Sequence, residues 1–280
     1  MTEWSEVAHG VYQRRYEPLD ISVVVIAGDD GLLVVDTRSN PAEGGEIVAD
    51  VARRFGGSPI RWVVNSHAHY DHTFGNQRLG PASEVNAQIY GHHLIPRHFE
   101  DFEAPRIARG EVDPARPLDP LWADVVLTPP THPVDTRTLL GLGGRVVELV
   151  PLAPGHTDTD LVVLVPDARV WVVGDIVEQS GPPLYGSGCF PFGWPNVLDG
   201  LLTEIEPGDL IVPGHGTVVD RAFVERQSAQ LRVVADRIRA SWVEGLSIDQ
   251  ALAPDAAPWP FPSELLRPAL SRGYDQLAST

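Results

Sequence analysis

Short apolar runs separated by polar turn residues fill the amino-terminal part of the chain. Residues 7–12, 21–27 and 32–36 are rich in valine, isoleucine and leucine, a pattern typical of buried or half-buried strands. The segment 28–31, Gly-Asp-Asp-Gly, separates the last two runs, and these residue types tolerate the positive φ angles of tight hairpin turns. The pattern therefore predicts an amino-terminal β-meander.

Apolar residues recur at helical spacing in two longer segments. Ile47, Val48, Val51 and Phe55 indicate a helix over residues 42–55 that crosses one face of a sheet. A second apolar stripe follows Asp220, a residue type favoured at helix N-caps, and predicts a long helix that covers a sheet. The other predicted elements are strands over 60–64, 85–90, 145–150, 161–165 and 170–173, a short helix over 73–79, a helix from about His92 and a terminal helix over 263–278.

Prolines interrupt this pattern in two places. Residues 104–137 contain seven prolines, which helix interiors and central strands do not accommodate. We interpret this segment as an insertion or long loop that forms a lid over a site. Residues 253–262 are also rich in proline. We therefore divide the chain into a main domain over 1–252 and a carboxy-terminal extension over 253–280.

Composition excludes several functional classes. The formal net charge of −17 repels polyanions, which argues against nucleic acid as a partner. No apolar run is long enough to span a membrane, and the acidic amino terminus lacks the features of a secretory signal, so we expect a cytoplasmic protein. Cys189 is the only cysteine, so no disulfide forms within the chain. All cationic side chains are arginine, which excludes lysine-based catalysis.

One six-residue segment carries a dense set of potential metal ligands. His67, His69, Asp71 and His72 follow directly on the predicted strand over 60–64. Imidazole and carboxylate are ligand types that suit zinc and neighbouring divalent metals. The alternative, a solvated polar loop, does not account for four potential ligands at this spacing. The segment therefore predicts a metal site.

A single segment cannot surround a cation, so further ligands are expected downstream. His156, Asp175 and His215 each stand next to a glycine, and an apolar run precedes each of them. Glycine allows a sharp turn where a strand ends. We expect these strand ends to converge on one edge of the fold.

Together these seven residues resemble the dinuclear pattern of the metallo-β-lactamase superfamily of metallohydrolases. The resemblance spans residues 7 to about 220 and includes Asp36, which follows an early strand. It implies an α/β fold, an αββα four-layer sandwich of two mixed β-sheets with helices on the outer faces. It also implies that His67, His69 and His156 hold one metal, that Asp71, His72 and His215 hold the second, and that Asp175 bridges them.

By the same resemblance, Asp36 would hold a ligand in place from behind, unless it is only a turn residue at a strand end. The sequence departs from the family at Thr159, where many members have glycine, but the ligand set is complete.

Two divalent cations, zinc first and manganese or iron as alternatives, would hold a bridging hydroxide as the nucleophile. We identify Asp71 as the catalytic residue that orients this hydroxide in addition to binding metal. Family members with aspartate at the position of Asp175 include lactonases, thioesterases and phosphodiesterases, whereas true β-lactamases have cysteine or serine. We therefore expect hydrolysis of an ester, lactone or thioester of a small, partly apolar molecule. The alternatives are β-lactam hydrolysis, a di-iron redox enzyme, a phosphodiesterase and a metal-stabilised binding module.

Aromatic residues near the predicted ligands are candidates for the substrate pocket. Tyr70 stands within the ligand segment, and Tyr185, Phe190 and Trp194 follow Asp175 in a glycine- and proline-rich loop. These last aromatics could equally pack into the core. We interpret the other histidines as structural or surface residues, and the sequence leaves open whether the chain forms a homo-oligomer.

Overall fold

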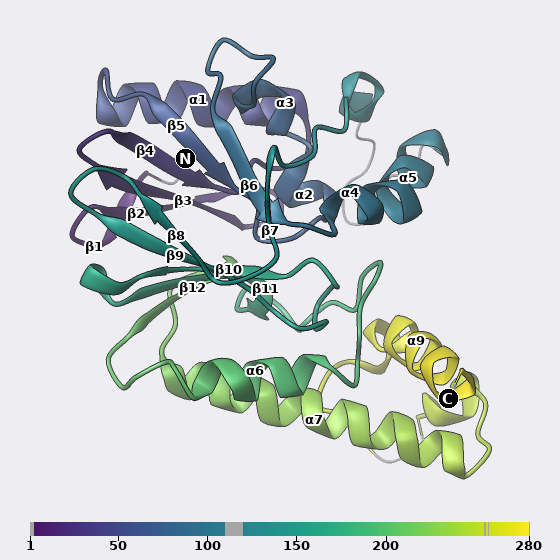
Figure 1. Ribbon diagram of the computed structural model, residues 1–280. Coiled ribbons are helices and arrows are strands. Elements are labelled where there is room, and N and C mark those ends of the chain that lie inside the picture. The colour runs from purple at the N-terminus through teal and green to yellow at the C-terminus, as the bar shows by residue number, and fades with distance from the viewer. Residues whose placement is uncertain (1–2, 110–119, 255, 257, 280) are drawn as a thin grey trace.

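Two sheets lie face to face in the computed structural model, and helices cover the outer face of each (Figure 1). The structure describes residues 3–109, 120–254, 256 and 258–279. Helices α1 (Pro41–Phe55) and α3 (Asn76–Leu79) cover the amino-terminal sheet, and α6 (Trp194–Leu202) and α7 (Arg221–Val243) cover the carboxy-terminal sheet. The expected αββα four-layer sandwich is confirmed.

Each sheet contains antiparallel and parallel pairs. The amino-terminal sheet consists of β1 (Ser5–Ala8), β2 (Val11–Tyr16), β3 (Ile21–Gly28), β4 (Gly31–Val35), β5 (Ile60–Val64), β6 (Gln88–His92) and β7 (His132–Val134). Its first four strands pair antiparallel, and β4 to β7 pair parallel. The carboxy-terminal sheet consists of β8 (Thr138–Gly141), β9 (Val146–Pro151), β10 (Leu161–Val165), β11 (Val170–Glu178) and β12 (Leu210–His215). Only its β11–β12 pair is parallel among the described residues.

Strand pairing joins the two sheets where β12 lies next to β3. Among the described residues this contact consists of one antiparallel register pair, His215 with Ile21. The candidate ligand His215 therefore lies at the junction of the two sheets.

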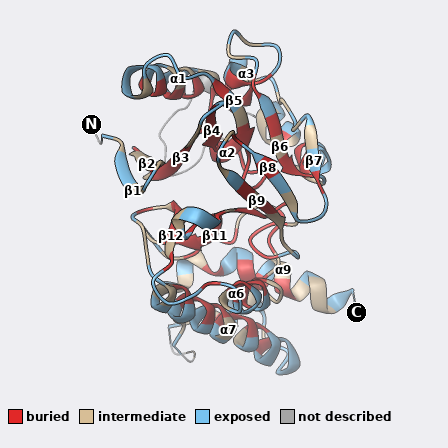
Figure 2. Ribbon diagram, turned by 60° about the vertical axis from the view of Figure 1, so that its left-hand side comes forward, coloured by how far each residue is buried: buried red, intermediate tan, exposed pale blue. Residues whose placement is uncertain are grey.

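Apolar residues fill all three spaces between the four layers. Along β3, Val24 faces the other sheet, whereas Val23 and Val25 face the side that α1 covers. Both faces of this strand are thus buried, which explains its continuous apolar run. A third cluster packs α6 and α7 against the carboxy-terminal sheet. Figure 2 shows the same layering, with buried strands between helices whose outer faces are exposed.

Several element boundaries differ from the sequence prediction for local reasons. The predicted strand over 7–12 is two strands, because Gly10, with φ of 71°, turns the chain between β1 and β2. The run over 85–90 begins later, as β6, after Asn86 with φ of 54°. Strand β11 continues through Asp175 instead of ending before it. The helix predicted over 73–79 is α2 (Tyr70–Thr73) followed by α3, so it begins inside the ligand segment.

The proline-rich segment over 104–137 contains more regular structure than a loop. The helix predicted near His92 is α4 (Ile95–His98), followed by a π-helical turn, Phe99–Glu103, and by α5 (Ala104–Arg109). A 3₁₀ turn, Pro120–Asp124, precedes β7, an edge strand that tolerates its proline. Residues 110–119, in the middle of the predicted lid, lie outside the described residues.

The carboxy-terminal extension packs against the main body. After α8 (Ile248–Ala251) and the 3₁₀ turn Ser263–Leu265, helix α9 (Arg267–Ala278) lies beside α7 (Figure 1). Leu266, Ala269 and Leu270 are buried in the same cluster as residues of α7. Tyr274 stacks edge-on against Trp242 at 5.2 Å between ring centroids. None of the helices described here is long and apolar enough to cross a membrane.

Candidate metal centre

The ligand-rich segment begins where β5 ends, beside the end of β4. Asp36 follows β4 with a φ of 65°, and its carboxylate turns toward the segment. It accepts hydrogen bonds from the backbone N–H of Ser66 at 2.8 Å and from the Ser66 hydroxyl at 2.7 Å. Its Oδ2 also lies 2.8 Å from His72 Nδ1. Asp36 thereby orients His72 so that Nε2 faces the centre, as expected for a residue that supports a ligand from behind.

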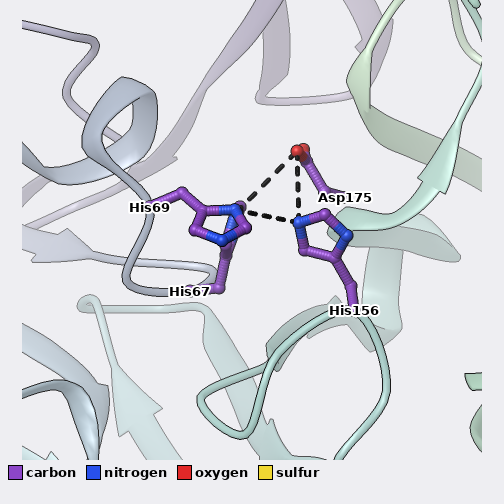
Figure 3. A group of neighbouring side chains, drawn as sticks. All are labelled: His67, His69, His156 and Asp175. Carbon is purple, nitrogen blue, oxygen red and sulfur yellow. Dashed lines mark hydrogen bonds and ion pairs between the residues drawn. The ribbon is translucent and has the colours of Figure 1, made fainter. Parts of the chain in front are cut away.

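Three imidazoles converge to form the first group. Nδ1 of His69 lies 3.0 Å from Nε2 of His67 and 3.0 Å from Nε2 of His156. Figure 3 shows these rings pointing toward one another and toward Asp175. On the far side, His69 Nε2 donates to the Ser187 carbonyl at 2.9 Å. Burial lowers the pKa of His67 and His69 well below the usual value, so both rings are neutral and able to bind a cation.

The second group consists of Asp71, His72 and His215. His215 Nε2 lies 3.4 Å from Asp71 Oδ2, and its Nδ1 donates to the Leu19 carbonyl at 2.8 Å. His72 Nε2 lies 3.8 Å from the same Asp71 oxygen. These three side chains come from α2 and from the end of β12, and they are brought together at the sheet junction.

Asp175 lies between the two groups. Its Oδ2 is 3.8 Å from His67 Nε2 and 3.6 Å from His156 Nε2. Toward the second group, Oδ2 is 3.4 Å from His215 Nε2, and Oδ1 is 3.1 Å from His72 Nε2. The Asp175 carboxylate thus faces both groups and would bridge two cations held by them.

The donor set fits two divalent cations. Within each group, one nitrogen or oxygen atom per residue lies within 4.8 Å of all the others. Ligand atoms around a tetrahedral zinc ion are separated by roughly 3.3 Å, given bond lengths of about 2.0 Å. His72 Nε2 and Asp175 Oδ1 are buried and lie 3.1 Å apart, but neither forms a hydrogen bond within the part of the chain that the structure describes, which is costly unless a cation binds there. The ligand roles of the seven residues remain predictions, and the structure brings all seven together.

Within the second group, the carboxylates and the imidazoles stabilise one another's charged forms. Burial raises the pKa of Asp71, but His72 and His215 outweigh this effect and lower that pKa to about 2. Burial lowers the pKa of His72 and His215, but Asp175 raises both well above the usual value. A divalent cation bound by this group would replace those protons, because ligands bind metal in their deprotonated form.

Glycines permit the close approach of the carboxy-terminal strands. A Cβ at Gly214 would lie 1.8 Å from Asp175 Oδ1, and one at Gly174 would lie 2.6 Å from the Ser66 side chain. Gly174 also has a φ of 56°, which glycine adopts readily. These glycines stand beside the predicted ligands because a larger residue would displace them.

Thr159, the departure from the family pattern, connects the two halves of the site. Its hydroxyl accepts a hydrogen bond from the backbone N–H of Ala68 at 3.0 Å and lies 2.8 Å from the Thr157 hydroxyl. Ala68 stands between His67 and His69, and Thr159 is fully buried. The threonine thus ties the loop that carries His156 to the ligand-rich segment.

A cleft of about 870 Å³ opens onto the centre. Among the predicted ligands, His69, Asp71, His156, Asp175 and His215 line it. Its other walls come from α5, from the loop over 180–187 and from α9, which Figure 1 places at the same end of the molecule.

Two of the four predicted pocket residues line this cleft. Tyr70 and Tyr185 do so. Trp194 does not, because it is fully buried and packs behind His156 at 4.9 Å between ring centroids. Phe190 is also absent from the wall, and its backbone hydrogen bonds hold the turn next to Gly155.

Several cleft residues carry no signal in the sequence. Arg106 and Arg272 belong to helices far apart along the chain, and their shared position depends on how the helices pack.

The other histidines do not line the cleft. His98 is buried beside His69 with ring centroids 5.6 Å apart, and its Nδ1 lies 3.3 Å from Asp158. His93 and His132 stack on His92 and Tyr90 outside the cleft.

Comparison with known proteins places this architecture in a family. The profile of the metallo-beta-lactamase superfamily matches residues 16–233. Among curated proteins, the alpha subunit of 2,4-dinitroanisole O-demethylase from Nocardioides sp. (strain JS1661) is 25% identical over 81% of this chain and 62% of its own length. The beta subunit is 28% identical over 72% of this chain and 56% of its own length. The chain thus spans roughly three fifths of these relatives.

Solved structures show the same fold at lower identity. A sec-alkylsulfatase from Pseudomonas sp. is 16% identical, with a TM-score of 0.77 over 99% of this chain and 50% of that chain. A metallo-beta-lactamase from Pontibacter korlensis is also 16% identical, with a TM-score of 0.66 over 83% of this chain and 99% of that chain. By its profile match, its four-layer fold and its two ligand groups, the chain belongs to the metallo-β-lactamase superfamily.

Proposed function

We propose that the protein is a metal-dependent hydrolase that cleaves an ester, lactone or thioester of a small organic substrate. The observation that carries this proposal is the convergence of five histidines and two aspartates beside an open cleft, which five of these seven residues line. Two divalent cations, zinc in our proposal, would supply Lewis acidity that activates water and stabilises negative charge. Closed structural zinc sites, in contrast, are usually completed by four protein ligands.

Asp71 would position the attacking water. Its Oδ2 lies 3.4 Å from His215 Nε2, and the side chain also lines the cleft. Because its pKa is lowered to about 2, the carboxylate is ionised at neutral pH and accepts hydrogen bonds only. It can therefore hold a water molecule with one O–H directed toward Asp71 and a lone pair directed toward the substrate.

Tyr185 would donate a hydrogen bond to the substrate. Tyr185 lines the cleft, and its buried hydroxyl has no hydrogen-bond partner among the described residues. Burial raises its pKa well above the usual value, so the hydroxyl keeps its proton. A donor held in this way can stabilise the oxygen of a carbonyl group under attack.

The test is a panel of lactones, esters, thioesters, β-lactams and phosphodiesters, assayed with zinc-, manganese- and iron-loaded protein. We expect the zinc form to turn over a carboxylic ester, lactone or thioester fastest. Asp71→Ala should reduce kcat/KM on the best substrate by more than about 100-fold, since water positioning and one ligand are lost together. Asp167→Ala, a change at an exposed residue of the same charge, serves as the control.

Three results would overturn the proposal. Purified protein with two irons and a visible charge-transfer band would indicate a redox enzyme. A phosphodiester or β-lactam as the fastest substrate would reassign the bond that is cleaved. An Asp71→Ala variant with parental activity would remove Asp71 from the reaction.

Hydrolysis of an aryl methyl ether is a second candidate. Both subunits of a 2,4-dinitroanisole O-demethylase resemble most of this chain. In this reaction water would break one C–O bond of the ether, giving 2,4-dinitrophenol and methanol. Including 2,4-dinitroanisole in the panel decides between the two functions, because 2,4-dinitrophenol is coloured and its release is measured directly.

A further inference from the structure

Helix α9 places an arginine without a partner in the wall of the cleft. Arg272 is half-buried and lines the cleft together with Pro268 of the same helix. Among the described residues it forms no hydrogen bond or ion pair, and its guanidinium carbon lies 6.0 Å from the centroid of the Phe102 ring. Its charge is therefore available to a ligand in the cleft.

Two other arginines near the cleft, in contrast to Arg272, have partners within the protein. Arg106, on the opposite wall, donates to the buried Glu103 at 2.8 Å and to the Ser187 hydroxyl at 3.0 Å. Arg267, on the same helix as Arg272, pairs with Asp249 at 2.5 Å. Both side chains have a partner within the protein, whereas Arg272 has none among the described residues.

Among the described residues, no carboxylate of the cleft wall forms an ion pair with Arg272. Asp101 pairs with Arg97 at 3.3 Å, and Glu178 accepts a hydrogen bond from the Leu184 N–H at 2.9 Å. A half-buried guanidinium that loses part of its hydration is stabilised by an anion with which it forms charge-assisted, bidentate hydrogen bonds. Arginine is better suited than lysine to such planar recognition of a carboxylate.

Apolar side chains occupy the wall alongside these polar groups. Leu19, Phe102, Pro182, Leu184 and Pro268 all line the cleft. A ligand that reaches both the metal centre and Arg272 would therefore contact these apolar side chains with its body.

We propose that Arg272 determines substrate specificity by binding an oxyanionic group, such as a carboxylate, on the part of the substrate remote from the scissile bond. The substrate class is then an organic anion with an apolar body and a hydrolysable bond at its other end. This inference rests on the proposed hydrolytic function and adds the charge of the substrate to it. It also assigns the carboxy-terminal extension to the active site.

A pair of esters with matched size tests the charge preference. Mono-4-nitrophenyl succinate carries a free carboxylate, and 4-nitrophenyl butanoate has the same chain length without it. We expect Arg272→Gln to lower kcat/KM for the succinate ester roughly 10- to 100-fold, the range for loss of a charge-assisted hydrogen bond. The butanoate ester should change less than about threefold. Arg272→Lys should retain part of the preference, and Arg267→Gln, on the same helix, should leave both esters unchanged.

Binding of amide analogues separates this inference from the hydrolytic function. N-phenylsuccinamate and the neutral N-phenylbutanamide are titrated into zinc-loaded protein by calorimetry. Tighter binding of the succinamate to the parent, lost in Arg272→Gln, supports the inference even if no ester in the panel is cleaved. A preference that persists in Arg272→Gln shows that the carboxylate binds the metal centre, and overturns it. Equal losses for both esters, or no preference in the parent, also overturn it.

Discussion

The two halves of the molecule supply the candidate ligands in different ways. The amino-terminal half supplies four within one six-residue segment after β5, whereas the carboxy-terminal half supplies one from the loop after β9, one within β11 and one at the end of β12. The first set is held by local contacts, such as that of Asp36 with His72. The second depends on close packing at Gly174 and Gly214. All seven candidate ligands therefore come together only when the two sheets are packed against each other as they are in this fold.

Removing the carboxylate between the groups should have the largest effect. Asp175→Ala eliminates the side chain that lies within 3.8 Å of His67, His72, His156 and His215. We expect kcat/KM to fall by more than about 100-fold and the bound metal to fall below two ions per chain, as measured by elemental analysis. Asp167→Ala should change neither quantity. Two tightly bound ions in Asp175→Ala would contradict the bridging role.

Adding one methyl group to β12 should reduce activity almost as strongly as removing Asp175. In Gly214→Ala the new Cβ would meet Asp175 Oδ1 at 1.8 Å, so the carboxylate must move. A displacement of this size at a reacting centre costs about 100-fold in rate, and overpacking costs about 1–3 kcal/mol of unfolding free energy. Gly200→Ala is the matched control, because a Cβ there has no neighbour within 4 Å and lies in helix α6. If both variants kept full activity, the close packing would have no role in the site.

Weakening the support behind His72 should have an intermediate effect. Asp36→Asn keeps a residue type that tolerates the φ of 65° but loses the charge shared with Ser66 and His72. We expect zinc affinity to fall about 10- to 100-fold in a chelator competition titration. Asp50→Asn, at a buried ion pair of the same half, should affect stability and leave zinc affinity unchanged. Equal zinc affinity of Asp36→Asn and the parent would show that the contact is only structural.

The smallest expected effect is at the link between the halves. Thr159→Ala leaves the Ala68 N–H buried without an acceptor, which should cost about 1–3 kcal/mol of unfolding free energy in denaturant titrations. Thr159→Ser retains the hydroxyl and should recover most of that loss. Equal destabilisation by serine and alanine would indicate that the methyl group of Thr159, and not its hydroxyl, holds the loop.

Sequence patterns predicted the elements whose signals are local. The apolar periodicity of α1 and α7, the N-cap at Asp220 and the run of β5 are properties of neighbouring residues, and the structure confirms them. The sequence also predicts the seven candidate ligands, because their residue types and adjacent glycines are visible in the chain and resemble a known pattern.

Sequence patterns predict less well those features that depend on the backbone conformation of one residue or on packing between distant segments. Trp194 was a reasonable pocket candidate by its place in the chain, yet it lies fully buried behind His156. The turn at Gly10 divided a predicted strand, since a positive φ at one residue interrupts the pairing of its neighbours. The sequence offered no sign that Arg272 and Arg106 line one cleft.

By itself, the amino-acid sequence determined which side chains could bind cations and which segments bury apolar surface, since both follow from residue type and short-range spacing. Only the tertiary structure decided that Asp175 lies between the two ligand groups, that Thr159 joins the halves and that α9 forms a wall of the cleft. The physical reason is that these contacts join residues dozens to more than 150 positions apart. Their geometry is set by how sheets and helices pack, and no local pattern encodes it.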